Sequence, residues 1–236
     1  HLKPCVLELG GSDPYIIFND ANIEKAIETA ITARFLNNGQ TCISAKRFLF
    51  QDTLFEKALT LFMKKTSQFI TYNNPLNNDT TVGPLANKNG HTNLTSQLKR
   101  ANISPKNIAY QHHQPNPQGF YFPATIIDAT TLSNDNVLLN EEIFGPIAVC
   151  QSFTNTHDAI TKANSTQFGL GASIWTTSQT IKNECIKNIE CGTIAINSMV
   201  TSKPNIPFGG RKNSGLGIEL GIDAVFSFTG EKHIHN

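Results

Sequence analysis

Cys42 is the residue of this sequence best suited to covalent chemistry. It closes the segment Asn38-Gly39-Gln40-Thr41-Cys42, which follows an expected helix and precedes an expected strand. A loop cysteine near helical N–H groups can have a lowered pKa and act as a nucleophile. The alternative is a buried structural thiol, because free cysteine packs like a small apolar residue.

Glu8 is a candidate general base. It lies in the segment Leu7-Glu8-Leu9-Gly10-Gly11, where apolar residues flank it on both sides. A carboxylate buried among such residues has a raised pKa, which suits proton abstraction near neutral pH. An outward-facing residue on an edge strand is the alternative. The two glycines that follow would let a ligand or another backbone come close.

Two further segments combine charged residues with turn residues. Residues 141–146 place Glu141 and Glu142 ahead of Phe144 and a Gly-Pro turn, which by itself describes a solvated turn. Residues 207–217 form a glycine-rich stretch with basic side chains that would suit a phosphate. Its spacing departs from the dinucleotide fingerprint. The histidines show no metal-ligand spacing, so no metal site is expected.

Alternating helical and strand patterns must position these residues. Strands are expected at residues 5–9, 15–18, 46–50, 125–128, 147–153, 172–176 and 193–197. Helices are expected from residue 23 to a stop at Asn37-Asn38-Gly39, and at residues 53–69, 88–101, 157–163 and 178–189. The alternation predicts an α/β fold, with an open, mainly parallel sheet and helices on both faces. We expect one domain over residues 1–226 and a tail over residues 227–236.

Composition excludes several classes of protein. The chain has 236 residues and a formal net charge of +1, so electrostatics favour neither nucleic acid nor an anionic membrane as a partner. No apolar run approaches the roughly 18 residues of a membrane helix, and no signal-peptide pattern opens the chain. The five cysteines include no CxxC pair, which favours reduced thiols and a cytoplasmic location.

In this order and spacing, the motifs resemble the catalytic half of the aldehyde dehydrogenase superfamily, and the resemblance covers nearly the whole chain. They are residues 7–11, Gly39-Gln40-Thr41-Cys42, residues 141–146, residues 207–210 and Ser214-Gly215-x-Gly217. Residues 8–14 and 45–47 look most like the succinate-semialdehyde type. The resemblance implies that family's catalytic domain, with the cofactor domain largely absent.

The resemblance also implies catalytic roles. Cys42 would attack an aldehyde, forming a thiohemiacetal that loses a hydride to NAD or NADP and becomes a thioester. The backbone N–H of Cys42 would donate to the oxyanion. Glu8 would activate the water that hydrolyses the thioester.

Binding roles follow from the same resemblance. Glu142 would hold the nicotinamide ribose, Phe144 would lie beside the nicotinamide ring, and Gly10 would belong to the same cofactor site. Phe208 would line the substrate pocket. The family often has an arginine where this sequence has Leu36. The remaining candidates to anchor a substrate carboxylate are Ser198, Thr201, Ser202 and Lys203.

We therefore expect the catalytic portion of an NAD(P)-dependent aldehyde dehydrogenase, acting on a small aldehyde such as succinate semialdehyde. We expect it to come from a longer, homo-oligomeric polypeptide and to be inactive by itself. Two alternatives stay open. One is a non-catalytic fragment that only associates with a partner subunit. The other is a thiol esterase that uses Cys42 and Glu8.

Overall fold

Seven strands form the central sheet of the molecule. The computed structural model describes residues 2–113 and 119–235. The strands of this sheet are β2 (Asp13–Ile17), β3 (Ala45–Gln51), β4 (Ile108–Gln111), β5 (Thr125–Asp128), β6 (Ile147–Phe153), β8 (Gly171–Trp175) and β9 (Thr193–Ile196). Their order is β4-β5-β6-β3-β2-β8-β9. Every neighbouring pair is parallel except β4 and β5, so the expected mainly parallel sheet is confirmed.

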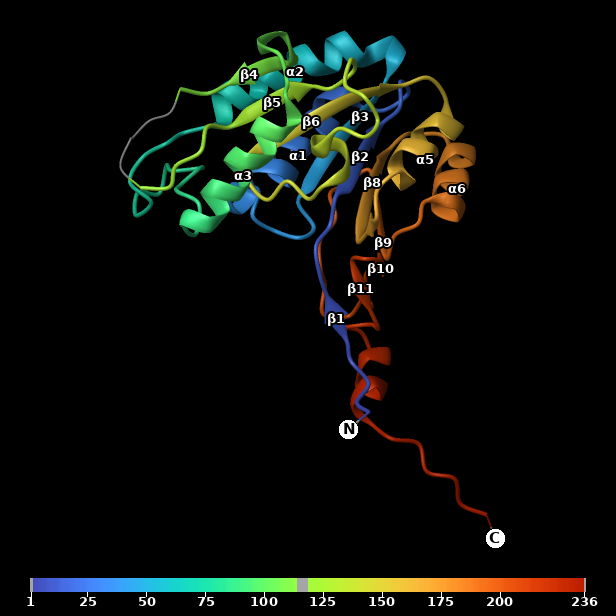
Figure 1. Ribbon diagram of the computed structural model, residues 1–236. Helices are drawn as coiled ribbons and strands as arrows, with labels where there is room; N and C mark the ends of the chain where they lie inside the picture. The colour runs from blue at the N-terminus through green and yellow to red at the C-terminus, as the bar shows by residue number, and fades with distance from the viewer. Residues whose placement is uncertain (1, 114–118, 236) are drawn as a thin grey trace.

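Helices cover both faces of the sheet because successive strand residues point to opposite sides. Along β2, Tyr15 and Ile17 belong to the apolar cluster that also contains residues of α1 (Ile23–Phe35) and α2 (Phe55–Phe69). Ile16 packs in a second cluster, with residues of α5 (Thr156–Asn164) and α6 (Gln179–Asn188). A third cluster joins β5 and β6 to α3 (Lys88–Ala101) and α4 (Val137–Asn140). The expected helices on both faces are therefore present (Figure 1).

The helix that leads to Cys42 has clear start and stop signals. The Asn22 side chain accepts a hydrogen bond from the backbone N–H of Lys25 at the beginning of α1. After α1 the chain forms the short 3-10 helix η1 (Leu36–Gly39). Asn37 and Asn38 have φ values of 52° and 58°, a conformation that asparagine tolerates better than most residues. The expected helix stop is confirmed.

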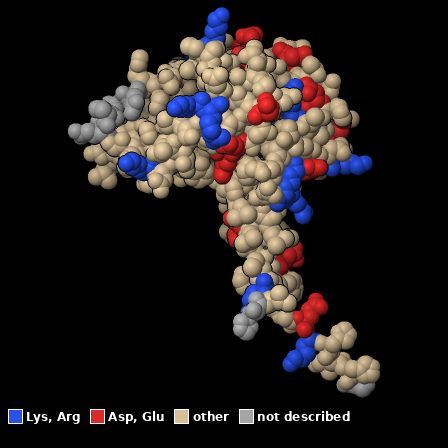
Figure 2. All heavy atoms as spheres, in the orientation of Figure 1, with Lys and Arg blue, Asp and Glu red and all other residues tan. Residues whose placement is uncertain are grey.

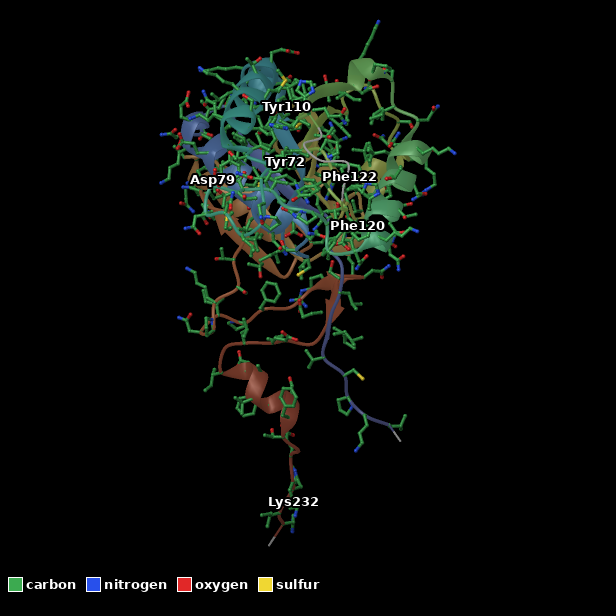
Figure 3. All side chains as sticks on the ribbon, turned by 90° about the vertical axis from the view of Figure 1, so that its left-hand side faces the viewer. Tyr72, Asp79, Tyr110, Phe120, Phe122 and Lys232 are labelled. Atoms are coloured by element: carbon green, nitrogen blue, oxygen red, sulfur yellow. The ribbon has the colours of Figure 1, made fainter. Side chains whose placement is uncertain are left out.

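A narrow stalk projects from the body, and both chain termini lie toward its far end (Figure 1). In it, β1 (Leu7–Glu8) pairs antiparallel with β11 (Gly215–Leu216). At its base, β10 (Arg211–Lys212) pairs with β7 (Phe168–Gly169). The 3-10 helix η4 (Asp223–Phe228) follows β11. Figure 3 shows Tyr72, Tyr110 and Phe122 on the body and Lys232 far from them, at the end of the tail.

Some elements differ from the expected ones. Strand β4 and helix α4 were not expected, because each is four residues long and shows no clear period. The short 3-10 helices η2 (Asp52–Leu54) and η3 (Pro105–Asn107) complete the elements. The expected boundary between residues 226 and 227 falls inside η4 and stays a prediction. The expected polar loop at residues 111–119 includes residues 114–118, which lie outside the described residues.

Acidic and basic side chains are interspersed on the face drawn in Figure 2. Within residues 2–113 and 119–235, no helix is both long and apolar enough to span a bilayer. The same residues contain no cluster of three or more His, Cys, Asp or Glu side chains arranged to hold a metal ion.

Candidate active site

Three loops with candidate residues begin three adjacent strands. Gly11 comes just before β2, Cys42 just before β3, and Glu142 a few residues before β6. These strands are neighbours in the order β6-β3-β2, and parallel strands begin at the same edge of a sheet. The three loops therefore meet at the amino edge of the sheet, where the chain enters the body from the stalk (Figure 1).

A buried lysine joins these loops. Lys46 donates from Nζ to the carbonyl oxygens of Thr41 at 3.1 Å and Cys42 at 2.8 Å. The same Nζ lies 3.4 Å from Glu142 Oε1. That carboxylate oxygen also accepts the backbone N–H of Gly11 at 3.0 Å. Glu142 is therefore held at the Cys42 turn by one charged and one neutral donor.

The two glycines before β2 allow the loops to come this close. A Cβ atom on Gly10 would lie 2.5 Å from Glu142 Oε2, and one on Gly11 would lie 2.6 Å from the carbonyl oxygen of Cys42. Neither separation is possible for a real side chain without displacement. Gly10 thus lies against Glu142, the residue with which the sequence grouped it.

The environment of Cys42 raises its pKa above the usual value of 9.0, so the expected lowered pKa is wrong. Burial is the largest cause, because it penalises the thiolate. The charge on Lys46 and the backbone N–H of Ile43 act in the opposite direction, while the carboxylates of Asp13 and Glu8 raise the pKa further. The thiol is protonated at neutral pH and needs a base to react.

Glu8 has the properties expected of a base that activates water. Burial is the first cause that raises its pKa, and the charge of Glu219 is the second, whereas the backbone N–H of Gly210 lowers it. Glu8 Oε2 is buried and accepts no hydrogen bond from the described residues. An unpartnered, partly desolvated carboxylate oxygen can accept a proton at little cost.

Arg34 is a second buried cation beside the site. Its guanidinium donates to the carbonyl oxygens of Gly39 at 2.7 Å, Ala45 at 2.8 Å and Gly145 at 2.6 Å. It thereby fixes both ends of the Cys42 turn to the loop that carries Glu142. Sequence reasoning assigned neither Arg34 nor Lys46 to the site. The signal available was Arg34 on the apolar face of its helix, and the adjacent pair Lys46 and Arg47 at the start of a strand that is otherwise mainly apolar.

A cavity of about 370 Å³ opens beside Cys42. Ser202 lines it together with apolar and hydroxyl side chains that include Leu36, Thr41 and Val200. The described residues that line it carry no charged side chain. Ser202 therefore lines the same cavity as Cys42, and its role as a substrate contact stays a prediction.

The two aromatic candidates lie apart from this cavity. Phe208 lines a different cavity of about 160 Å³, together with Gly192 and Arg211. The backbone of Phe208 is paired with Glu219 through hydrogen bonds of 2.7 Å in both directions. Phe144 is 44% exposed and follows Glu142 by two positions, so its ring is accessible at the amino edge of the sheet.

The chain belongs to the aldehyde dehydrogenase family, whose model matches residues 1–234. Among curated relatives, succinate-semialdehyde dehydrogenase [NADP(+)] of Mycobacterium leprae is 38% identical over 233 residues, covering 99% of this chain and 50% of the relative. The Mycobacterium tuberculosis enzyme named succinate-semialdehyde dehydrogenase [NADP(+)] 1 is 37% identical with the same coverage. The chain spans about half the length of these relatives.

Solved structures agree with this assignment. An NAD-dependent aldehyde dehydrogenase from Sinorhizobium meliloti has a TM-score of 0.88 and 30% identity, covering 94% of this chain and 44% of that chain. Betaine aldehyde dehydrogenase from Staphylococcus aureus, solved with NAD+, has a TM-score of 0.89 and 27% identity, covering 97% of this chain and 46% of that chain. The fold of this chain is therefore that of an aldehyde dehydrogenase domain.

Proposed function

We propose that this chain is the catalytic portion of an NAD(P)-dependent aldehyde dehydrogenase, with Cys42 as its nucleophile. The observation that carries the proposal is the convergence of a half-buried thiol, a buried cation and the carboxylate of Glu142 at one sheet edge. The Cys42 sulfur adds to the aldehyde carbon and its proton leaves to a base. The resulting thiohemiacetal loses a hydride and becomes a thioester on Cys42.

Glu8 is the base that activates water in this proposal. Its raised pKa and unpartnered Oε2 suit removal of a proton from water that attacks the thioester. Hydrolysis releases the carboxylic acid and returns the thiol. The backbone N–H of Cys42 donates to the oxyanion of both tetrahedral species.

The residues at the sheet edge fit a nicotinamide cofactor, NAD or NADP. The missing side chain at Gly10 leaves the Oε2 side of Glu142 open, and Phe144 presents an exposed ring nearby in the sequence. We propose that Glu142 holds the ribose hydroxyls and that Phe144 and Gly10 border the ring and its approach. When bound, the nicotinamide supplies the hydride acceptor.

We propose succinate semialdehyde as the substrate, on the names of the relatives at 37–38% identity. Hydroxyl groups of the cavity, Ser202 and Thr201, would hold the distal carboxylate, since no cationic side chain lines it. Phe208 remains a proposed substrate contact from its own cavity. In a longer polypeptide that contains these residues and oxidises aldehydes, replacing Ser202 with Ala should raise KM for succinate semialdehyde several-fold and leave KM for butanal unchanged.

The remaining proposals concern the context of the chain. Residues 1–226 form the catalytic unit and residues 227–236 an oligomerisation tail of a cytoplasmic homo-oligomer. The 236 residues expressed alone are proposed to form no NAD(P)H from aldehyde. Aldehyde-dependent turnover by those residues, abolished in Cys42→Ala, would contradict that proposal.

Ester hydrolysis tests the nucleophile without any cofactor. 4-Nitrophenyl acetate should acetylate Cys42 and release a stoichiometric burst of 4-nitrophenol, and Cys42→Ala should abolish the burst. Cys5 is exposed and reacts with many electrophiles, so every chain carries Cys5→Ser. A burst that survives Cys42→Ala would overturn the assignment of the nucleophile. No burst at all would favour a non-catalytic fragment.

A further inference from the structure

Lys46 is a fully buried lysine, which is unusual for a charged side chain. The residue is 0% exposed, and it lies on β3 between Ala45 and a second buried cation, Arg47. Its three N–H donors meet three acceptors: the carbonyl oxygens of Thr41 and Cys42 and the carboxylate of Glu142. An ammonium without such partners would be expensive to bury, and a methionine would fill similar space without that cost.

The three acceptors belong to the two segments that the proposed reaction uses. Thr41 and Cys42 form the turn that presents the thiol, and Glu142 is the proposed ribose-binding carboxylate. One nitrogen atom therefore fixes the nucleophile turn and the cofactor carboxylate relative to each other. Glu142 Oε1 is occupied by Lys46 and by Gly11, which leaves Oε2 for a ligand.

Four charged groups face Lys46 and the thiol from other elements. They are Asp13 on β2, Arg34 on α1, Glu142 before β6 and Glu8 on β1. The pKa of Lys46 is lowered to about 8. Burial is the main cause, and the charge of Arg34 acts in the same direction. Asp13 and Glu142 raise it. Lys46 is therefore mostly charged at pH 7, when its charge favours the Cys42 thiolate.

We propose that Lys46 is a positioning residue of the active site, holding Glu142 against the Cys42 turn and favouring ionisation of the thiol. The inference rests on the proposed function of Cys42 and Glu142. Lys46 donates no proton to substrate and forms no bond with it. It acts through the two residues that its ammonium group joins.

The pH dependence of Cys42 alkylation by iodoacetamide tests this role in the 236-residue chain carrying Cys5→Ser. Peptide mass spectrometry measures the rate at Cys42 itself. Both Lys46→Met and Lys46→Gln should raise the apparent pKa of Cys42 by about one unit. Alkylation at pH 7 should slow about threefold, because a tenfold loss of thiolate is partly offset by its greater nucleophilicity.

Lys212→Met is the matched control. Lys212 also donates to two carbonyl oxygens, of Asn164 and Thr166, and pairs with Glu190 at 2.9 Å. It is not among the charges that affect Cys42. Its removal should leave the alkylation profile of Cys42 unchanged, although it deletes the same kinds of contact.

The unmutated lysine provides a second readout. As Lys46 loses its proton near pH 8, its effect on the thiol disappears, so the rate should rise with pH less steeply than for a single titrating group. Glu142→Gln should move this shallow region to lower pH, because the Glu142 carboxylate raises the pKa of Lys46.

The outcomes separate the two proposals. An alkylation profile unchanged in a cooperatively folding Lys46 variant would overturn the role of Lys46 while leaving Cys42 as the nucleophile. If neither Lys46 variant folds, the unmutated chain provides the test. The role of Lys46 is also overturned if the alkylation rate of Cys42 follows a single titrating group, or if Glu142→Gln does not move the shallow region of the pH profile. Absence of the ester burst at Cys42 would instead overturn the proposed function, and this inference with it.

Discussion

The backbone N–H of Gly11 donates a 3.0 Å hydrogen bond to the carboxylate of Glu142, although 131 positions separate the two residues in the chain. Gly11 also lies so close to the Cys42 carbonyl that no side chain fits there. One glycine thus brings the nucleophile turn and the Glu142 loop together. Both segments were recognisable in the sequence, but their contact depends on the order of three strands.

Replacing Gly11 with Ala should therefore disturb the site itself. The added Cβ would lie 2.6 Å from the Cys42 carbonyl oxygen, so the turn must shift. We expect unfolding to become easier by about 1–3 kcal/mol, as for other overpacked sites, and Cys42 alkylation to change rate. Urea unfolding and iodoacetamide labelling measure the two effects. Gly83→Ala is the control, because its Cβ would meet nothing nearer than 3.8 Å. Equal effects of the two substitutions would contradict this account.

Arg34 should be among the most important single residues for stability. Arg34→Met leaves the carbonyl oxygens of Gly39, Ala45 and Gly145 without their charged donor. We expect a loss of about 3–5 kcal/mol in the free energy of unfolding, typical of a broken buried charged network. Arg100→Met removes an exposed pair with Glu141 and should cost less than about 1 kcal/mol. Thermal and urea denaturation of both variants test the contrast, and a cost for Arg34→Met as small as for Arg100→Met would refute it.

Asp13 should make the stability of the chain depend on pH. Burial, its largest cause, raises the pKa of Asp13 from 3.8 to about 6, against the opposing charges of Lys46 and Arg47. The native state therefore binds this proton more tightly than the unfolded state. The contribution of Asp13 to stability is greatest below about pH 4 and declines as pH rises to about 6. Over that interval it amounts to about 3 kcal/mol.

Asp13→Asn keeps an acceptor for the backbone N–H of Gly171 and should abolish this slope. Urea unfolding between pH 4 and pH 7 measures this slope, as the difference in the free energy of unfolding between the unmutated chain and Asp13→Asn. Asp158→Asn should change the pH dependence of stability with the opposite sign, and urea unfolding below about pH 4 should show it. Burial tends to raise the pKa of Asp158, but hydrogen bonds, first from Lys162, outweigh it and lower the pKa. Asp158 therefore stabilises above the unfolded pKa, and this stabilisation is lost as pH falls. A slope retained in Asp13→Asn would exclude Asp13 as its source.

Glu8 should control the second half of ester hydrolysis. Glu8→Gln should preserve the burst from Cys42 and reduce the steady-state rate by about 100-fold, the usual contribution of a general base. In the unmutated chain that rate should rise with pH through the raised pKa of Glu8. Glu219→Gln should keep the rate but shift its inflection to lower pH, because the Glu219 charge raises the pKa of Glu8. Unchanged turnover in Glu8→Gln would remove Glu8 from the mechanism.

Local pattern predicted much of this fold. Apolar periodicity located the principal strands and helices, and Asn37-Asn38-Gly39 marked the stop before the nucleophile turn. Strand β4 and helix α4 were not predicted because neither short segment shows a clear apolar period. The strand order is not local information, since it depends on which apolar faces pack together.

Some residues of the candidate site were also predicted from the sequence, and others were found only from the structure. Cys42, Glu8 and Glu142 stood out through residue type and motif. The direction of the Cys42 pKa was misjudged because burial, invisible in the sequence, outweighs the nearby N–H donors. Lys46 and Arg34 were missed because each joins the Cys42 turn to the distant loop that carries Glu142, a contact that sequence spacing does not show; Arg34 and Gly145 are 111 positions apart. Phe208 shows the same difficulty, since the structure places it in a separate cavity.

The proposed catalytic residues lie in two different parts of the molecule, the stalk and the body. Glu8 is carried by β1 and held by β11, outside the body, whereas Cys42 is fixed within the body by Lys46 and Arg34. Gly10 and Gly11 connect the two parts of the site, so the separation of Glu8 and Cys42 depends on how the two-stranded stalk is placed on the body. In the proposed mechanism, the placement of the stalk therefore affects the position of the base without displacing the nucleophile.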